Sequence, residues 1–208
     1  MNLMNNEIKQ ENTTIRQVRN FFYELSKSFF LEEPDQEKFI RWQKIIAHLA
    51  REAPNVTLAE AARQLSLALT ELDASAVKNE YYDLFVNPFS HRLVNWTASF
   101  YVNGRNFGRK LVDIRQLMAE QGLVKEDAFK EPEDSLPVLL DLMARLIEIE
   151  DDLGDSGPAA QRQLLQEFLL PLADQMRQRL QADEKARFYP VCAEFLEAWL
   201  QLDESYFI

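Results

Sequence analysis

The chain has 208 residues, a hydrophobic fraction of 47% and a formal net charge of −11. This hydrophobic fraction is typical of a folded globular protein and argues against a disordered chain, and the length is sufficient for one substantial core or two small ones. The acidic charge repels nucleic-acid backbones and anionic lipids and attracts basic peptides, although ordinary solubility explains it equally well.

Cysteine usage and the N-terminal sequence indicate the compartment. Cys192 is the one cysteine, so the chain cannot form an internal disulfide, which is typical of a reducing compartment. Residues 1–14 lack the apolar segment of a secretory signal peptide, and no apolar run approaches the length of a membrane span. We therefore expect a cytoplasmic protein with no membrane insertion and with a flexible N-terminus over residues 1–14.

The first half of the chain has the apolar spacing of helices. Apolar residues recur every three or four positions, which predicts helices over about 15–29, 39–49, 57–72 and 74–86. The stretch 87–98 has no clear period and contains several turn formers. We therefore predict a loop there.

A further helix is predicted from this loop to about Gly122, where a glycine is a plausible stop. Gly104 and Gly108 lie one turn apart and permit either a close backbone approach or a break in the helix. Four apolar side chains are predicted on the inner face of this helix: Phe107, Leu111, Ile114 and Met118.

The last part of the chain alternates polar breaks with helices. A polar loop over 122–133 precedes an apolar helix, and the strongest break is the glycine-containing stretch 151–158. A long helix over 158–182, kinked by Pro171, and a final helix follow. No strand pattern or internal repeat is convincing, so the sequence predicts an all-α protein, a single-domain helical bundle of about eight helices over residues 15–208. The apolar stripe of the final helix is Phe188, Cys192, Phe195, Trp199 and Leu202.

The residue types needed for most enzyme chemistry are missing. His48 and His91 are the two histidines, and neither belongs to a Glu-x-x-His pair of a di-iron site. A single cysteine does not support a zinc site, and no phosphate-binding glycine loop is present. We therefore expect no catalytic residue, no metal, no cofactor and no nucleic-acid partner.

Acidic residues gather immediately before the apolar helix that follows residue 133. Glu131, Glu133 and Asp134 surround Pro132. Asp134 is sufficiently explained as the N-cap of that helix, with Pro137 at its third position. The two glutamates are either ordinary solvated surface acids or carboxylates held on a stiff turn for an arginine-containing ligand.

An aromatic stretch precedes the predicted loop. On a helix, Tyr81, Leu84 and Phe85 share a face, and Trp96 follows at the end of the loop. Core packing is the default explanation of such a stripe, and a peptide-binding floor is the alternative, because such side chains have apolar bodies and polar tips. For a binding site to form, this face and the acidic turn must line one cleft.

These two stretches resemble motifs of the TorD/DmsD/NarJ family of chaperones for molybdenum-cofactor oxidoreductases. "EPED" before an apolar helix, "YYDLF" about fifty residues earlier and the segment "LLPLADQMRQRLQADEKARFYPVCAEFLEAWL" carry the resemblance, over roughly 15–204. The family motif Glu-Pro-x-Asp-His matches up to its fifth position, where this chain has serine instead of histidine. The resemblance implies a TorD-like fold and a client-binding site made of Glu131, Pro132, Glu133, Asp134, Ser135, Tyr81, Leu84, Phe85 and Trp96.

The resemblance also implies a function and partners. Family members bind the twin-arginine signal peptide or another part of the catalytic subunit of a molybdoenzyme. They hold the apo-enzyme back from export until its cofactor is inserted. The family includes monomers and domain-swapped dimers, and the break at 151–158 is a plausible hinge for such an exchange.

Two other classes of function remain open on the sequence. A helical regulatory or scaffold protein that binds no signal peptide would carry the same acids only for solubility. A hydrolase or nucleotide-binding enzyme on an α fold is the weaker alternative, because no residue pattern supports it directly.

Overall fold

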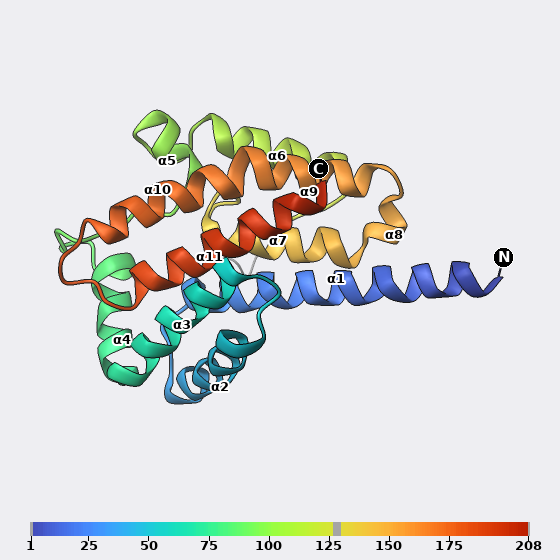
Figure 1. Ribbon diagram of the computed structural model, residues 1–208. Helices are drawn as coiled ribbons and strands as arrows, with labels where there is room; N and C mark the ends of the chain where they lie inside the picture. The colour runs from blue at the N-terminus through green and yellow to red at the C-terminus, as the bar shows by residue number, and fades with distance from the viewer. Residues whose placement is uncertain (1, 127–129, 208) are drawn as a thin grey trace.

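A computed structural model describes residues 2–126 and 130–207 of the protein. Within this part the regular elements are helices, and the only β pairing is an isolated bridge between Thr97 and Ser135 (Figure 1). The all-α prediction is confirmed. The α-helices are α1 (Asn2–Phe30), α2 (Gln36–Glu52), α3 (Val56–Glu71), α4 (Ala74–Tyr81), α5 (Ala98–Asn103), α6 (Arg109–Glu120), α7 (Leu136–Glu148), α8 (Glu150–Leu153), α9 (Ser156–Leu164), α10 (Leu170–Gln181) and α11 (Tyr189–Glu204).

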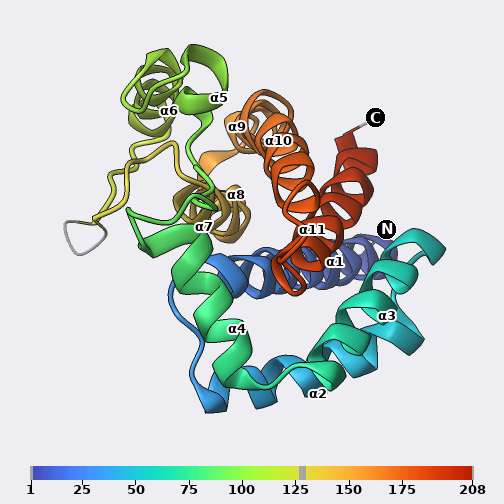
Figure 2. The same cartoon turned by 90° about the vertical axis from the view of Figure 1, so that its left-hand side faces the viewer.

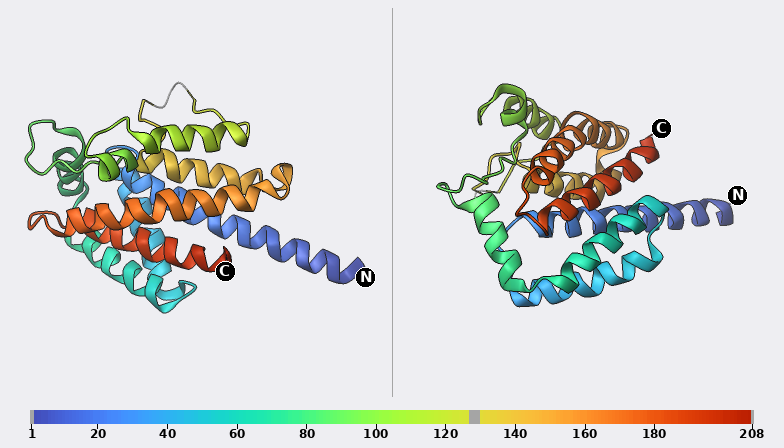
Figure 3. Two further views of the ribbon diagram at one scale, coloured as in Figure 1. Left: turned by 90° about the horizontal axis from the view of Figure 1, so that it is seen from above. Right: turned by 60° about the vertical axis from the view of Figure 1, so that its left-hand side comes forward.

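The helices pack around α1 and α11. Helix α1 packs against α7, and α11 packs between α10 and α3. Helices α2 and α3 form an antiparallel pair that covers one side of the molecule, and α5 and α6 lie at the opposite side (Figure 2). The N-terminal part of α1 extends beyond the other helices (Figure 3). The predicted division into residues 1–14 and 15–208 stays a prediction, and the helix itself begins at Asn2.

Local sequence explains where three of the helices begin. The side chains of Asp35, Asn55 and Asp73 each accept a hydrogen bond from the backbone N–H three residues later, at the starts of α2, α3 and α4. Each bond satisfies one of the backbone donors that a helix leaves unpaired in its first turn. These caps fix the helix starts, and the apolar stripe of each helix then decides which face turns inward.

A buried ion pair joins the two central helices. Arg19 of α1 donates from Nε to Asp203 Oδ1 at 2.6 Å and from Nη2 to Asp203 Oδ2 at 3.0 Å. Tyr23 and Gln161 complete the network, because the Tyr23 hydroxyl donates to Asp203 and the Gln161 side chain accepts from Arg19. Both charged residues are almost inaccessible to solvent. Since every donor and acceptor in it must find a partner away from water, this network fixes how α1, α9 and α11 meet.

The predicted helix before Gly122 is interrupted. Gly104 ends α5 with a φ of 69°, in the left-handed region that favours glycine, so the break permitted there is present. The prediction for Phe107 is wrong. This residue lies in the connection before α6 with a φ of 60° and is 74% exposed, because the helical period that placed it inward does not run through the break.

The predicted kink at Pro171 stays a prediction, and a π-helical turn, η2 (Leu165–Leu169), lies just before this proline, between α9 and α10. Proline has no N–H to donate to the carbonyl four residues earlier. That carbonyl, of Glu167, instead accepts a hydrogen bond from Lys110 Nζ at 2.9 Å. The carbonyl that Pro171 leaves without a helical donor therefore provides a contact between α6 and the π-helical turn.

Candidate functional site

The acidic turn at Glu131–Ser135 is held by backbone pairing with the segment that carries Trp96. The Ala98 N–H donates to the Asp134 carbonyl at 2.9 Å, and the Leu136 N–H donates to the Trp96 carbonyl at 2.9 Å. Within the turn, the Ser135 N–H donates to the Pro132 carbonyl. The acidic turn is therefore in direct backbone contact with the segment that carries Trp96. The aromatic residues predicted as a binding floor, Tyr81, Leu84, Phe85 and Trp96, do not line the cavity beside Glu133, so that cavity does not unite the two motifs in one cleft.

Asp134 does not cap the helix that follows it, and this prediction is wrong. Helix α7 begins at Leu136 with Ser135 at the N-cap position, and its proline falls within the first two helical positions. The Asp134 carboxylate instead accepts from the Ser99 N–H at 2.8 Å, so it caps the first turn of α5. Asp134 and Ser135 are both fully buried. The serine at the family's histidine position therefore faces the interior of the molecule.

The accessible part of the acidic turn consists of Glu131, Pro132 and Glu133, which are half-buried. Glu133 accepts two hydrogen bonds from Arg115 of α6, from Nε and from Nη2, each at 3.0 Å. Burial of Glu133 opposes its ionisation, but the bonds and charge of Arg115 outweigh this effect and hold its pKa below the ordinary range. The Glu131 carbonyl accepts a hydrogen bond from Lys125 Nζ. The side chain of Glu131, unlike that of Glu133, is not held by Arg115.

A cavity of about 560 Å³ adjoins Glu133. Its other lining residues come from α6 and the segment after it: Arg115, Met118, Ala119, Gly122, Leu123, Val124 and Lys125. A second cavity of about 460 Å³ shares four of these residues and continues between α1 and α7, where Val138, Leu142 and Ala144 line it. Since the shared residues join the two spaces, the acidic turn opens onto a partly apolar groove along α6 and α7.

The second cavity has more acidic than basic residues along it. The acids are Glu24, Glu126, Asp141 and Glu148, and the bases are Lys125 and Arg145. Glu131 and Glu133 add two acids and Arg115 adds one base, so six acids and three bases lie along or beside the groove. Lys27 pairs with both Glu24 and Asp141, and the balance of charge still stays negative. The resulting negative field attracts a cationic segment and disfavours an acidic one.

The predicted aromatic residues gather in one cluster. The rings of Phe85 and Trp96 stack with centroids 5.1 Å apart, and Tyr81 and Tyr189 contact the Phe85 ring. Tyr81 and Leu84 are buried, whereas Phe85 and Trp96 are half-buried. The buried pair belongs to the core, and the stacked pair forms the edge of the cluster that solvent reaches.

The π-helical turn η1 (Tyr82–Val86) turns other apolar side chains outward. Tyr82 and Val86 are each 45% exposed, and Phe89 in the following loop is 88% exposed. Tyr82 and Phe89 belong to the aromatic stretch noted in the sequence, but the exposure of these side chains was not predicted, because a regular helical period describes neither a π-helical turn nor the loop after it. Arg115 and the groove along α6 and α7 were also missed, because their relation to the acidic turn is purely tertiary.

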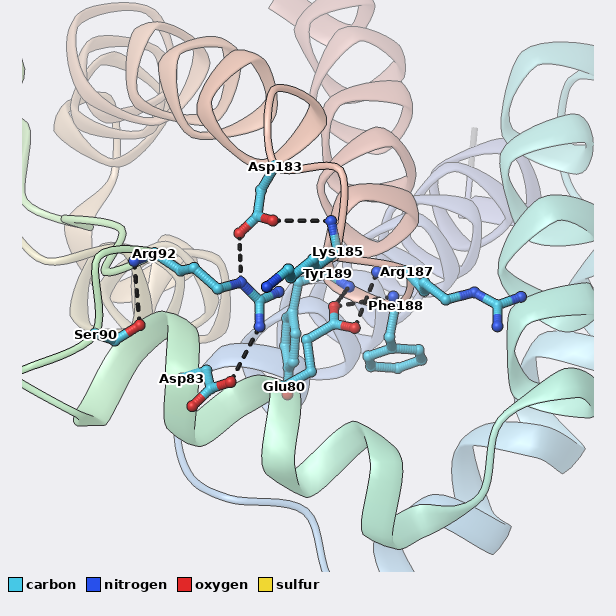
Figure 4. A network of polar contacts seen from close by, with 9 residues as sticks. All are labelled: Glu80, Asp83, Ser90, Arg92, Asp183, Lys185, Arg187, Phe188 and Tyr189. Carbon is cyan, nitrogen blue, oxygen red and sulfur yellow. Dashed lines mark hydrogen bonds and ion pairs between the residues drawn. The ribbon is translucent and has the colours of Figure 1, made fainter.

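The acids next to the aromatic stretch have structural partners (Figure 4). The Glu80 carboxylate accepts from the backbone N–H groups of Arg187, Phe188 and Tyr189, at the start of α11. Arg92 donates to Asp83 at 3.0 Å and to Asp183 at 2.7 Å. This network fastens the segment 80–92 to the connection between α10 and α11, so the exposed side chains on η1 are presented from a fixed backbone.

The acidic turn also acts on the aromatic cluster at a distance. Burial raises the pKa of Tyr81, and the charges of Glu131, Glu33 and Glu32 raise it further. The Tyr81 hydroxyl donates to the Phe30 carbonyl, so it stays protonated and contributes to the packing of the core. The negative field around the cluster therefore comes from both the acidic turn and the connection between α1 and α2.

Other chemistry is sparse in the described residues. They contain no group of three His, Cys, Asp or Glu side chains arranged to hold a metal ion. Cys192 is buried, and burial raises the pKa of its thiol well above the ordinary value, so it is an unreactive core residue. None of the helices of residues 2–126 and 130–207 combines the length and apolar character that a membrane span requires.

Comparison with known proteins places both motifs within a common family. A family model described as nitrate reductase delta subunit matches residues 52–200. Chaperone protein TorD of Vibrio atlanticus (strain LGP32) is 28% identical over 194 residues, which cover 86% of this chain and 89% of that protein. A crystal structure from Archaeoglobus fulgidus, described as a redox enzyme maturation protein, matches with a TM-score of 0.51 and 22% identity, covering 88% of this chain and 93% of that one. At this identity the structural match supports the fold alone.

Proposed function

The chain belongs to the nitrate reductase delta subunit family, the TorD/DmsD/NarJ group, and from this premise we propose that it is an assembly chaperone for a redox enzyme. Its client is the catalytic subunit of a molybdenum-cofactor oxidoreductase. The protein acts in the cytoplasm and binds the twin-arginine signal peptide of the client, or a similar segment with paired arginines and an apolar run. It holds the client until the cofactor has been inserted and releases it for export.

One observation carries this proposal. Glu133 lines one end of a partly apolar groove along α6 and α7, and Glu131 lies two residues before it on the same turn, which is fixed by backbone pairing. A signal segment with two arginines followed by apolar residues has the complementary order of charge and hydrophobicity. Arginine binds carboxylates through paired, charge-assisted hydrogen bonds, and apolar side chains bind where they displace water from apolar walls.

The mechanism of retention is occlusion. The glutamates bind the arginines, and the groove covers the apolar run, so the export signal is not accessible while the complex lasts. No covalent bond is made or broken, and no cofactor is required. The exposed side chains of Tyr82, Val86 and Phe89 form a second apolar surface, which supports a further contact with the folded part of the client.

Titration calorimetry with a synthetic peptide that carries paired arginines and an apolar run tests this function. The wild-type protein is expected to bind it with a Kd of about 1 μM or below. The double charge reversal Glu131→Lys with Glu133→Lys is expected to weaken binding by at least about tenfold, because it replaces attraction by repulsion at the arginine contacts. Asp134 is excluded from the test, because its burial makes reversal there a folding defect.

Glu52→Lys is the matched control. Glu52 is exposed at the end of α2, and α2 contributes no residue to the groove. This variant makes one charge reversal where the test variant makes two, and it is expected to keep the affinity within about threefold of wild type, because distant surface charges are screened by salt. Equal weakening by Glu52→Lys, or an unaffected affinity of the double variant, would contradict the assigned site. Absence of binding by the wild type would contradict signal-peptide recognition.

A further inference from the structure

We propose that Arg115 occupies, in the free protein, the position of a client arginine on Glu133, and that a client binds by exchanging its guanidinium for that of Arg115. This inference rests on the proposed function and adds a built-in competitor to it. It makes Arg115 a residue that lowers the affinity and raises the selectivity of client binding without itself contacting the client.

The geometry of the pair is that of arginine recognition. The Nε and Nη2 atoms of Arg115 each lie 3.0 Å from a different oxygen of Glu133. This two-point contact is the arrangement through which a planar guanidinium recognises a carboxylate. The Glu133 carboxylate therefore already displays, within one chain, the contact that the proposed function requires between two chains.

The pair is also placed so that it can be exchanged. The Arg115 side chain is 57% exposed, whereas that of Glu133 is 14% exposed. Within the described residues the Arg115 guanidinium makes no polar contact other than the one to Glu133. The mobile partner is thus the arginine, which can swing into solvent, while the carboxylate stays on its fixed turn.

Space for an incoming side chain lies beside the pair. Arg115 and Glu133 both line the cavity of about 560 Å³, together with Met118, Leu123 and Val124. A client arginine that displaces Arg115 therefore brings its neighbouring apolar residues against an apolar wall. Lysine is a poorer competitor than arginine, because its ammonium group is a point charge that does not reproduce the two-point contact.

The variant Arg115→Gln tests this exchange in a titration with the peptide that carries paired arginines. Removal of the competitor is expected to tighten binding by about threefold to fivefold, the scale set by an exposed ion pair. The control is Arg109→Gln on the same helix, which removes the same charge from a residue that pairs with Asp113 and not with Glu133. This control is expected to change the affinity by less than about twofold.

Two further arms separate exchange from a general charge effect. In a Glu133→Gln background, Arg115→Gln is expected to have no effect, because no carboxylate remains to compete for. With a peptide in which both arginines are lysines, Arg115→Gln is expected to change the affinity less than it does for the arginine peptide. Circular dichroism melting curves check that each variant is folded.

The outcomes distinguish this inference from the function on which it rests. If the wild type binds and Arg115→Gln binds no more tightly than Arg109→Gln, the exchange is wrong and the proposed function stands. If Arg115→Gln tightens binding equally in the Glu133→Gln background, the exchange is likewise wrong and the proposed function stands. If neither the wild type nor any variant binds the peptide, the signal-peptide function fails and the exchange fails with it.

Discussion

Among the residues that the structure describes, two arginine–carboxylate pairs have the same two-point geometry and opposite surroundings. Arg19 and Asp203 join α1 to α11 in the core, where both are almost inaccessible. Arg115 and Glu133 join α6 to the acidic turn at the surface, where the arginine is 57% exposed. The chemistry of the contact is the same, and the access of water differs.

This difference in access of water indicates which pair stabilises the fold and which pair is available for binding. A buried charge that loses its partner has no water to replace it, so the Arg19–Asp203 pair is committed to the fold. In the pair at the surface the arginine is exposed although the carboxylate is largely covered, so water competes for the arginine and the pair contributes less to stability. The second pair is therefore available for exchange with a partner. The sequence alone does not distinguish acids that stabilise the fold, such as Asp203, from acids available for binding, such as Glu133.

The largest effect is expected from breaking the buried pair. Asp203→Ala leaves the Arg19 guanidinium buried without its carboxylate and is expected to lower the free energy of unfolding by about 3–5 kcal/mol. Urea denaturation followed by circular dichroism measures it. Glu133→Ala is the matched variant of the exposed pair and is expected to change this free energy by less than about 1 kcal/mol. Similar losses for the two variants would remove the contrast between the pairs.

A somewhat smaller loss of stability is expected at Glu80. Glu80→Ala removes the acceptor of three backbone N–H groups at the start of α11 and is expected to destabilise the protein by about 2–3 kcal/mol. Glu71→Ala is the control, because Glu71 contacts the same segment through an exposed pair with Arg187. A loss below about 0.5 kcal/mol for Glu80→Ala, as expected for the control, would show that this acid is not a structural cap.

The smallest effect is expected from the acid titration of the exposed pair. The pKa of Glu133 lies below its ordinary value in the fold, so its pair with Arg115 stabilises the protein above a pH of about 4.3. This contribution is lost as the pH falls through the lowered pKa. The difference in urea midpoint between wild type and Arg115→Gln is therefore expected to be small at neutral pH and to vanish on acidification. A difference that grows at low pH would contradict this assignment.

Local regularity explains which features could be predicted from the sequence. The helices, the loop before α5 and the buried position of Cys192 follow from apolar spacing and turn formers, which act over a few residues. A contact between Phe85 and Trp96 could also be expected from the sequence, since large aromatic side chains near a loop pack together.

The remaining features depend on contacts between distant residues or on irregular backbone. Asp134 has the local signature of an N-cap, but the N–H that it binds belongs to Ser99, 35 positions earlier. Phe107 fits a helical stripe, yet a backbone with positive φ carries it outward. The pairing of Arg115 with Glu133 depends on how α6 approaches the turn, and no pattern within either segment encodes it.

Hydrogen exchange of the free protein and of its complex with the twin-arginine peptide tests the central claim most directly. That claim is that the groove along α6 and α7, with the acidic turn at its end, is where the client segment binds. Slower exchange over residues 118–125 and 130–136, with no change in α2 and α3, is the predicted result. Protection confined to α2 and α3, or no protection around the acidic turn in a saturated complex, would contradict the claim.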